Sequence, residues 1–500
     1  MIEKSLPVKE TSKTYDKPEF ESKDTLSYDM KWHGKHEVTI DYIKKGKLMD
    51  TDLIDYVLTA DEYNIAMLEA TVPTSYFTLI AADKDGETFN SLIGGGYNPN
   101  APKIITMERS GSYNWEELLP NMYGCPFLTE KELEQSLISG KNYAIEQMEA
   151  MREYMTYLYE LNSSSKFTLF INDLSNDQIL YLLADTGIGF ANSKVFMISD
   201  GVGTYTEITD YYGQDETNDK SMQEYNDLEQ LWYKVKEKAF NHDASYLIDL
   251  QMKFGGFRRR APHMQPVQML DDEINIKWIV NRKRTDTFGS TQVAQEYIIN
   301  NPNVVEINIY NLYKGLSVEE QKEVRELLKV DFDMINEAES QGKRILLFLG
   351  TRHDLSQGNL LDYIKFITQY VGDEYAVFYK GHPGEMSNLS SEKINALKEY
   401  GVQILDFSVP AEFFYLFKSG LSGCGYPSST FGNVVSEIDR IPVIAGRTYE
   451  DMKVEDSNYK DEVEIYISRQ SDGKYIVQDK KENKTGIWDP STDVDQIVWK

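Results

Sequence analysis

Short apolar runs alternate with longer amphipathic segments along the first half of this chain. Apolar runs of five to seven residues predict strands, and apolar positions at a spacing of three or four predict helices. The predicted strands are 76–82, 103–107, 166–171 and 194–198, and the predicted helices are 130–161, 178–183 and 221–240. Strands and helices in alternation are typical of βαβ units with a parallel sheet.

The same alternation resumes after an irregular middle at 241–310. A helix over 317–339 begins with Ser317 as its cap and Glu320 in the capping-box position. The further predicted strands are 344–349, 374–379, 402–405 and 441–445, and the further predicted helices are 359–371, 391–400 and 431–437. Two such arrays predict an α/β protein with two Rossmann-like, doubly wound domains that face each other across a cleft.

Domain limits follow from the change in pattern along the chain. Five hundred residues exceed what one hydrophobic core holds, so more than one domain is expected. We expect a polar N-terminal extension over 1–65, a first Rossmann-like domain over 66–310 and a second over 311–450. A tail over 451–500 is predicted to form a hairpin around Ser471-Asp472-Gly473.

Composition narrows the function classes. The formal charge of −29 argues against broad nucleic-acid binding, which needs a basic face. No run approaches the ~18 apolar residues of a membrane span, and residues 1–20 lack the apolar stretch of a secretory signal. Cys125 and Cys424 form no metal motif or disulfide framework, so a cytoplasmic protein is expected.

Two basic runs, Arg258–Arg260 and Arg282–Arg284, interrupt this acidic background. A solvated or salt-bridged surface is the favoured interpretation. The alternative is contact with a charged glycan or with an anionic membrane surface, which leaves peripheral membrane association open.

The segment Lys380-Gly381-His382-Pro383 follows the apolar run at 375–379, which places a histidine at the carboxyl end of a buried strand. Open α/β sheets bind ligands at that edge, and an imidazole can donate a proton to a departing phosphate oxygen near neutral pH. Ser428 and Ser429 precede a predicted helix, where capping hydroxyls and free N–H groups can hold a phosphate.

A carboxylate supplies the remaining chemistry. Asp200-Gly201 directly follows the strand at 194–198, where Asp200 is well placed as a general base. Glu412 adds a hydrogen-bond acceptor for a ribose or a base. Each motif alone has a plain structural alternative, as a turn or a helix cap, and only their order and spacing favour chemistry on a phosphate-linked donor.

In that order the blocks resemble those of the bacterial GT-B sialyltransferases of glycosyltransferase family 80. That family carries an Asp-Asp-Gly block, a Lys-Gly-His-Pro block, a following glutamate and a Ser-Ser pair. Here they read Ser199-Asp200-Gly201, Lys380–Pro383, Glu412 and Ser428-Ser429. Further matches are Asn172, Tyr205 and Gly350-Thr351, and the likeness covers roughly residues 70–440.

The resemblance implies an inverting transfer of sialic acid from CMP-sialic acid to a glycan hydroxyl. It implies Asp200 as general base, His382 as general acid, and Ser428 and Ser429 at the phosphate. Lys380 and Gly381 would line the cytidine pocket and Glu412 would bind the ribose or base. Gly350 and Thr351 would also belong to the donor site, and Asn172 and Tyr205 to the acceptor site. The implied partners are a nucleotide sugar and an oligosaccharide, and no metal or other cofactor is expected.

The chain departs from the family pattern mainly on the acceptor and sugar side. Ser199 replaces the first aspartate, and Gly384-Glu385 follows His-Pro where the family has arginine. Three alternatives therefore stay open: a transferase for another CMP-linked acidic sugar such as Kdo or a different nonulosonate, a GT-B protein that binds glycans or nucleotides without turnover, and an enzyme with a nucleoside-diphosphate donor.

Overall fold

The computed structural model describes most of the chain in two units, which we treat separately. The first unit ends at Ile307 and the second begins at Asn308. The described residues are 12–22, 28–39, 60–69, 73–84, 86–108, 122–124, 151–152, 154–156, 158–173, 176, 178–199, 202–213, 218–243, 245–246, 249, 265–270, 274–351, 359–382, 391–407 and 409–500.

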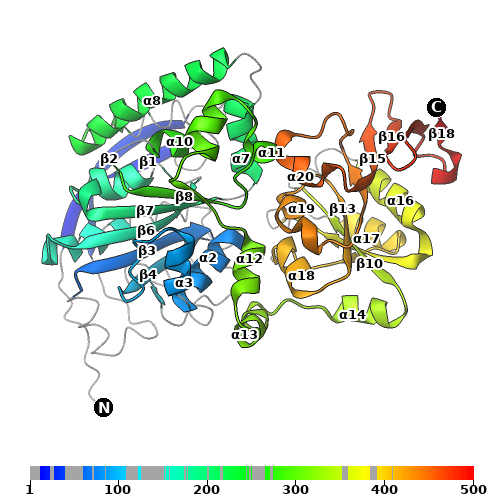
Figure 1. Cartoon of the computed structure of the whole chain (residues 1–500), viewed down its shortest axis with the longest axis horizontal. Helices are drawn as coiled ribbons and strands as arrows, with labels where there is room; N and C mark the ends of the chain where they lie inside the picture. The colour runs from blue at the N-terminus through cyan, green and yellow to red at the C-terminus, as the bar shows by residue number, and fades with distance from the viewer. Residues whose placement is uncertain are drawn as a thin grey trace. The chain divides into compact units, whose positions relative to one another are not determined.

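The first unit is built on a seven-stranded parallel sheet (Figure 1). Its strands are β3 (Glu62–Glu69), β4 (Lys103–Glu108), β5 (Met122–Gly124), β6 (Lys166–Asn172), β7 (Ser193–Ile198), β8 (Ile276–Val280) and β9 (Val304–Glu306). Their order across the sheet is β5-β4-β3-β6-β7-β8-β9. The chain therefore starts at a central strand, winds outward one way and then returns to wind the other, which is the doubly wound arrangement.

Both faces of this sheet are buried, as expected when parallel strands are covered by crossover helices. In β6, Leu169 and Ile171 pack into the larger core. The intervening Phe170 points to the other face, where its ring lies 5.2 Å from that of Phe196 and 6.0 Å from that of Phe89. The continuous apolar runs that predicted these strands are therefore the signature of double-sided burial.

Helices of the first unit follow the strands in sequence. Their bounds are α2 (Pro73–Lys84), α3 (Gly86–Leu92), α7 (Val202–Ile208), α8 (Asp219–Phe240), α10 (Gln265–Met269) and α11 (Thr285–Phe288), with π-helical turns at Leu180–Ala184, Thr209–Gly213 and Ala294–Ile299. Helix α8 confirms the prediction over 221–240 and buries one face, including Leu228 and Trp232.

The predicted strand at 76–82 is wrong, because these residues form most of α2. Phe77, Leu79, Ile80, Ala81 and Ala82 are all buried, so no polar face marks a helical period. Pro73 begins the helix, the position that proline favours. The strand from which this sheet winds outward is instead β3, which starts inside the segment expected to be a polar extension.

One other expectation for this half needs correction. The middle at 241–310 is not irregular throughout, since it contains β8 and β9 and two short helices. In the segment expected to be an extension, β1 (Ser12–Ser22) and β2 (Tyr28–Thr39) form an antiparallel pair. Of the helix predicted at 130–161, only its last part is among the described residues, and that part is helical.

The second unit contains one nine-stranded sheet. Its strands are β10 (Arg344–Leu349), β11 (Tyr375–Lys380), β12 (Gln403–Ile404), β13 (Leu421–Gly425), β14 (Ile441–Ala445), β15 (Val463–Arg469), β16 (Tyr475–Asp479), β17 (Lys484–Trp488) and β18 (Val498–Trp499). The order is β12-β11-β10-β13-β14-β15-β16-β17-β18. Strands β12 to β15 run parallel in the Rossmann order, and the remaining strands add antiparallel neighbours at one edge.

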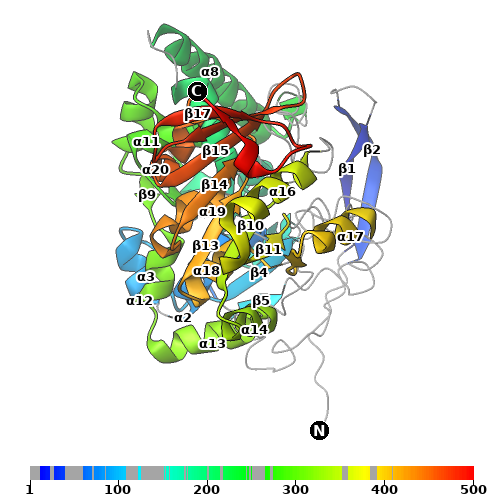
Figure 2. The same cartoon turned by 90° about the vertical axis from the view of Figure 1, so that its right-hand side faces the viewer.

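Helices lie on both sides of this second sheet (Figures 1 and 2). They are α12 (Ile309–Gly315), α13 (Val318–Leu328), α14 (Asp333–Ser340), α16 (Leu360–Val371), α17 (Ser391–Glu399), α18 (Ala411–Phe417), α19 (Ser429–Val434) and α20 (Ser457–Lys460). Helix α16 packs on one face, and α18 and α19 lie on the other side of β10 and β13 in Figure 1.

The predicted helix over 317–339 is two helices. The capping box of Ser317 and Glu320 is present at the start of α13. Lys329 then adopts the left-handed conformation with φ 47°, which ends α13 before α14 begins. No glycine stands at this position to signal the break.

Residues 451–500 belong to the second unit. The hairpin predicted around Ser471-Asp472-Gly473 is confirmed by the antiparallel pairing of β15 with β16. Val477 and Trp488 from this segment are buried in the same core as Phe348 of β10 and Phe366 of α16. The tail thus extends the Rossmann sheet instead of forming a separate element.

The point where the winding of the second sheet reverses lies between β10 and β13. Gly425 ends β13 with φ +111°, and an added Cβ would lie 2.4 Å from the carbonyl oxygen of Leu349 in β10. The next residue, Tyr426, donates its backbone N–H to that same oxygen over 3.0 Å. Glycine is therefore required for the two strand ends to meet.

We expect Gly425→Ala to destabilise the protein. The left-handed backbone alone costs about 1–3 kcal/mol for a non-glycine residue, and the contact with Leu349 adds to this cost. Gly342→Ala is the matched control, because Gly342 has φ +80° and open space where the Cβ would be. In chemical denaturation Gly425→Ala should lose more unfolding free energy than Gly342→Ala. Equal losses would contradict the steric argument.

Candidate functional site

The carboxyl edge of the second sheet collects the residues that the sequence predicted for a nucleotide. Gly350 donates its backbone N–H to the carbonyl oxygen of Lys380 over 3.0 Å, which joins the loops after β10 and β11. Lys380 is 2% exposed, and its Nζ donates to the carbonyl oxygens of Gly381 (2.7 Å) and Phe407 (3.2 Å). The Lys380 side chain therefore braces the loop that carries His382.

Glu412 is the acidic counterpart of this lysine. It lies in the first turn of α18 and is 5% exposed. Burial raises the pKa of its carboxyl above the usual range, while hydrogen bonds from its own backbone N–H, the Thr430 hydroxyl and the Asn433 amide, together with the nearby charge of Lys380, oppose that shift. Lys380, Glu412, Thr430 and Asn433 form what we call the Glu412 cluster, which ties β11, α18 and α19 together.

Ser428 caps α19. Its side-chain oxygen accepts a hydrogen bond from the backbone N–H of Thr430 over 3.3 Å. Ser428 and Ser429 are both half-buried, whereas Thr430 is buried in the Glu412 cluster. The two serines thus border the cluster, and sequence reasoning identified them correctly as the start of a helix. It missed Thr430, which directly precedes the helix predicted over 431–437, and Asn433, which lies within that helix.

The other predicted donor residues lie at the same edge of the sheet. Gly350 and Thr351 directly follow β10, and both are half-buried. Gly381 is buried, and His382 is exposed at the end of the loop from β11. The structure therefore brings Gly350, Lys380 and Glu412 together with the serines at the reversal point between β10 and β13, where doubly wound sheets bind ligands.

The first unit presents a second, separate group of polar side chains at the carboxyl ends of β6, β7 and β8. Asn172 ends β6, and its Nδ2 donates to Ser75 Oγ of α2 over 3.1 Å. Ser199 Oγ lies 3.0 Å from the Tyr205 hydroxyl, which also accepts the backbone N–H of Asn281 over 2.8 Å. All five of these residues are buried.

Tyr205 is fully buried, and desolvation raises its pKa to about 12. Its hydroxyl hydrogen-bonds to Ser199 and to the backbone N–H of Asn281, so it fixes the starts of the loops after β7 and β8. Tyr205 is one of the two residues predicted for the acceptor site. Asp200 itself lies outside the described residues, although its neighbour Ser199 is anchored by a backbone hydrogen bond to Ile279 of 2.9 Å.

Asp173 is a buried carboxylate that sequence reasoning did not single out. Its two oxygens accept hydrogen bonds from Trp278 Nε1 (3.0 Å) and Thr204 Oγ1 (3.1 Å). A carboxylate that is 0% exposed must be compensated by such donors. Its signal in the sequence was its place directly after β6, the strand at the reversal point of the first sheet.

The basic run at Arg282–Arg284 is not a uniformly solvated surface. Arg282 is buried and lies close enough to Tyr205 to lower that residue's pKa in part. The Lys283 ammonium donates to the carbonyl oxygens of Asn301 and Val304. Only Arg284 is largely exposed, with Glu306 as its ion-pair partner at 3.6 Å. The other run, Arg258–Arg260, lies outside the described residues.

Comparisons with known proteins agree on the fold. No protein-family model matches the sequence, and no curated protein matches it. Among solved structures, the chain is similar to the 2,6-sialyltransferase of Vibrionaceae Photobacterium sp. JT-ISH-224, in a ternary complex with the donor product CMP and the acceptor substrate lactose. The TM-score is 0.54 at 14% identity, over 80% of this chain and 76% of that one.

Two further structures are similar over 80% of this chain. One is the α/β-galactoside α-2,3-sialyltransferase of Photobacterium phosphoreum, with a TM-score of 0.51, 12% identity and 96% of that chain covered. The other is the GT-B domain of the Photobacterium damselae sialyltransferase, with a TM-score of 0.50, 15% identity and 99% covered. The chain has the GT-B fold, and the solved structures it is similar to include bacterial sialyltransferases.

Two observations concern other kinds of site. Within the described parts of the chain, no helix has both the length and the apolar character that crossing a bilayer requires. In the same parts, no group of three or more histidine, cysteine, aspartate or glutamate side chains is arranged to hold a metal ion.

The Glu412 carboxyl predicts a pH-dependent contribution to stability. Its pKa is raised in the folded protein, so the contribution favours folding at low pH and is lost as pH rises through the raised pKa. Glu412→Gln removes that titration. We expect the difference in melting temperature, variant minus wild type, to increase between about pH 5 and about pH 8. A difference that falls or stays constant over this range would contradict the raised pKa.

The Tyr205 hydroxyl predicts a measurable loss of stability on removal. Tyr205→Phe leaves the buried N–H of Asn281 without its acceptor, which costs about 1–3 kcal/mol. Ser199→Ala removes only one bond to the same hydroxyl and leaves the Asn281 bond in place, so it should cost less. Urea denaturation of both variants measures which of the two loses more unfolding free energy. The opposite order would show that the Asn281 contact contributes little.

Proposed function

We propose that this protein is an inverting glycosyltransferase that moves sialic acid from CMP-sialic acid to a glycan hydroxyl. The observation that supports it best is the Glu412 cluster. Lys380, Glu412 and the serines of α19 come from segments that are separate in sequence, and all meet at the reversal point of one Rossmann sheet. The GT-B fold shared with three sialyltransferases supports the same class.

In the proposed reaction the oxygen of an acceptor hydroxyl attacks the anomeric carbon of the donor sugar. The bond from that carbon to the phosphate oxygen breaks, and its electron pair stays on the departing CMP. Asp200 takes the hydroxyl proton, and His382 donates a proton or a hydrogen bond to the leaving oxygen. The displacement occurs in one step, inverts the configuration and uses no metal.

Each described residue of the donor site has a place in this proposal. Ser428 and Ser429 would bind the phosphate through their hydroxyls, and the backbone of Lys380 and Gly381 would line the cytidine. Glu412 is enclosed by donors from this chain, so its role would be to shape the base and ribose site. It would accept a hydrogen bond from a ligand hydroxyl when movement frees one of its oxygens. His382 is exposed, as a group that must reach a bound ligand needs to be.

Nucleotide binding and turnover test the proposal together. Calorimetry with CMP, UDP and GDP should show binding of CMP in preference to the other two. CMP release should be observed with CMP-sialic acid from a panel that includes CMP-Kdo and other CMP-nonulosonates. Preference for UDP or GDP would contradict a CMP-linked donor and indicate a nucleoside-diphosphate donor instead. Preference for a different CMP-sugar would change the transferred sugar.

Two substitutions separate catalysis from binding. We expect His382→Ala and Asp200→Ala each to lower turnover by on the order of 10²–10⁴-fold, because each removes a general acid or base, while CMP affinity stays within about threefold. Ser428→Ala should instead weaken CMP binding through the loss of a phosphate contact. A purified protein that binds CMP and consumes no CMP-sugar with any acceptor would show a binding protein, not a transferase.

A further inference from the structure

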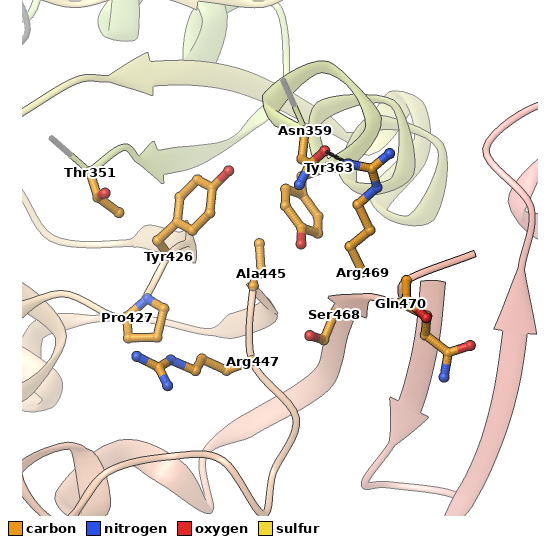
Figure 3. A pocket seen from close by; sticks show the side chains of 12 residues that line it. Thr351, Asn359, Tyr363, Tyr426, Pro427, Ala445, Arg447, Ser468, Arg469 and Gln470 are labelled. Carbon is orange, nitrogen blue, oxygen red and sulfur yellow. Dashed lines mark hydrogen bonds between the residues drawn. The ribbon is translucent and has the colours of Figure 1, made fainter. Parts of the chain in front are cut away.

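A pocket lies at the carboxyl edge of the sheet in the second unit (Figure 3). Its volume is about 680 Å³, within the range of small-molecule sites. It is lined by the residues that follow or flank β10, β13, β14 and β15: Thr351, Asn359, Tyr363, Tyr426, Pro427, Ala445, Gly446, Arg447, Ser468, Arg469, Gln470 and Ser471.

The charge of this pocket is opposite to that of the chain. The protein has 81 acidic residues against 52 lysines and arginines. The described residues that line the pocket nevertheless include two arginines and no aspartate or glutamate. Asp362, in the first turn of α16, accepts a hydrogen bond of 2.6 Å from the Tyr475 hydroxyl. The pocket is therefore suited to an anion.

Arg469 is held at the rim in a defined position. It ends β15, and its Nη1 donates to Asn359 Oδ1 over 2.7 Å, as the dashed line in Figure 3 shows. Asn359 directly precedes α16, so the arginine is tied to the helix on that side of the sheet. The guanidinium has five N–H donors, and this bond uses one of them.

Arg447 approaches from the neighbouring strand. Gly446 follows β14 with φ +79°, and an added Cβ would lie 3.1 Å from the Tyr426 ring. This glycine lets the chain pass close to the ring before Arg447, which lines the pocket together with Pro427 (Figure 3). Arg447 is half-buried, and among the described residues it has no hydrogen-bond or ion-pair partner. Partial desolvation of an uncompensated guanidinium strengthens its attraction for an anion.

An aromatic wall completes the pocket. The rings of Tyr426 and Tyr363 meet edge to face at 5.5 Å, and Tyr426 meets Phe348 in the same way at 5.9 Å. These contacts fix the Tyr426 ring, which remains partly exposed toward the pocket. A fixed ring and two guanidinium groups in one pocket suit a molecule with a ring-shaped body and an acidic group, and Ser468 and Thr351 add hydroxyls for its polar atoms.

We propose that this arginine pocket is a second ligand site, which binds the phosphate or carboxylate of an anionic sugar. It borders the nucleotide site, because Thr351 of the predicted donor residues lines it, and it extends from there to the other side of the sheet. In β11, Val377 and Tyr379 belong to the core under α16, so Lys380 points to the opposite face, where α18 and α19 lie. Arg469 lies on the α16 side, because its guanidinium donates to Asn359 at the start of that helix. Each guanidinium can donate two parallel N–H bonds to the oxygens of the acid.

Calorimetry on the full-length protein saturated with CMP tests this site. The probes are glucose 6-phosphate, glucuronate and uncharged glucose. We expect one or both acids to bind at millimolar concentration or tighter and glucose not to bind, and the preferred acid identifies phosphate or carboxylate as the recognised group. Failure of both acids to bind would overturn the proposal. Absence of CMP binding would contradict the proposed function and would leave the pocket proposal standing. The same titration of the acids without CMP then tests the pocket by itself.

Substitutions locate the bound acid. Arg447→Gln and Arg469→Gln should each weaken its binding by about tenfold or more, and Arg447→Lys should weaken it less, because charge is kept and the planar fork is lost. Arg344→Gln is the control, since Arg344 is an exposed arginine of this unit that pairs with Asp439 away from the pocket. Unchanged melting temperatures show that the variants fold. Binding that survives both glutamine variants and is lost in Ser428→Ala would place the anion at the nucleotide site and overturn the proposal.

Discussion

The second unit depends on the junction where β10 meets β13. One carbonyl oxygen, that of Leu349, accepts the N–H of Tyr426, and only a glycine at 425 allows this approach. The neighbouring bond from Gly350 to Lys380 fixes the loop after β11 to the same point. Because these contacts are between backbone atoms, they set where the loops begin regardless of which side chains the loops carry. Both the Glu412 cluster and the arginine pocket start from this junction.

Two uses of charge appear on the two sides of that junction. In the Glu412 cluster a buried carboxylate and a buried ammonium are each satisfied by the protein, which favours a rigid, preorganised wall. In the arginine pocket one guanidinium is held by Asn359 and the other has no partner among the described residues. A satisfied network shapes a site, whereas an unsatisfied charge attracts a ligand. The same sheet edge thus offers a nucleotide wall and an anion pocket.

Much of the fold was predictable because double-sided burial leaves a clear mark in sequence. The strands at 166–171, 194–198, 344–349, 374–379 and 441–445 are continuous apolar runs, and all of them form. The same rule failed at 76–82, since a helix buried on every side produces an equally continuous run. Strands β8 and β9 were missed because they are short and lie among polar segments, and only their neighbours in the sheet stabilise them.

By itself the sequence determined the two Rossmann-like arrays, the strand-end residues Lys380 and His382 and the helix start at Ser428. These are local properties, since a strand end is marked by the change from apolar to polar residues. Tertiary structure decided which of these ends meet. Thr430 and Asn433 became partners of Glu412, Asp173 a partner of Trp278, and Arg447 a neighbour of Arg469. Such pairings follow from strand order and crossover direction, which bring together residues far apart in the chain and leave no mark in the local pattern.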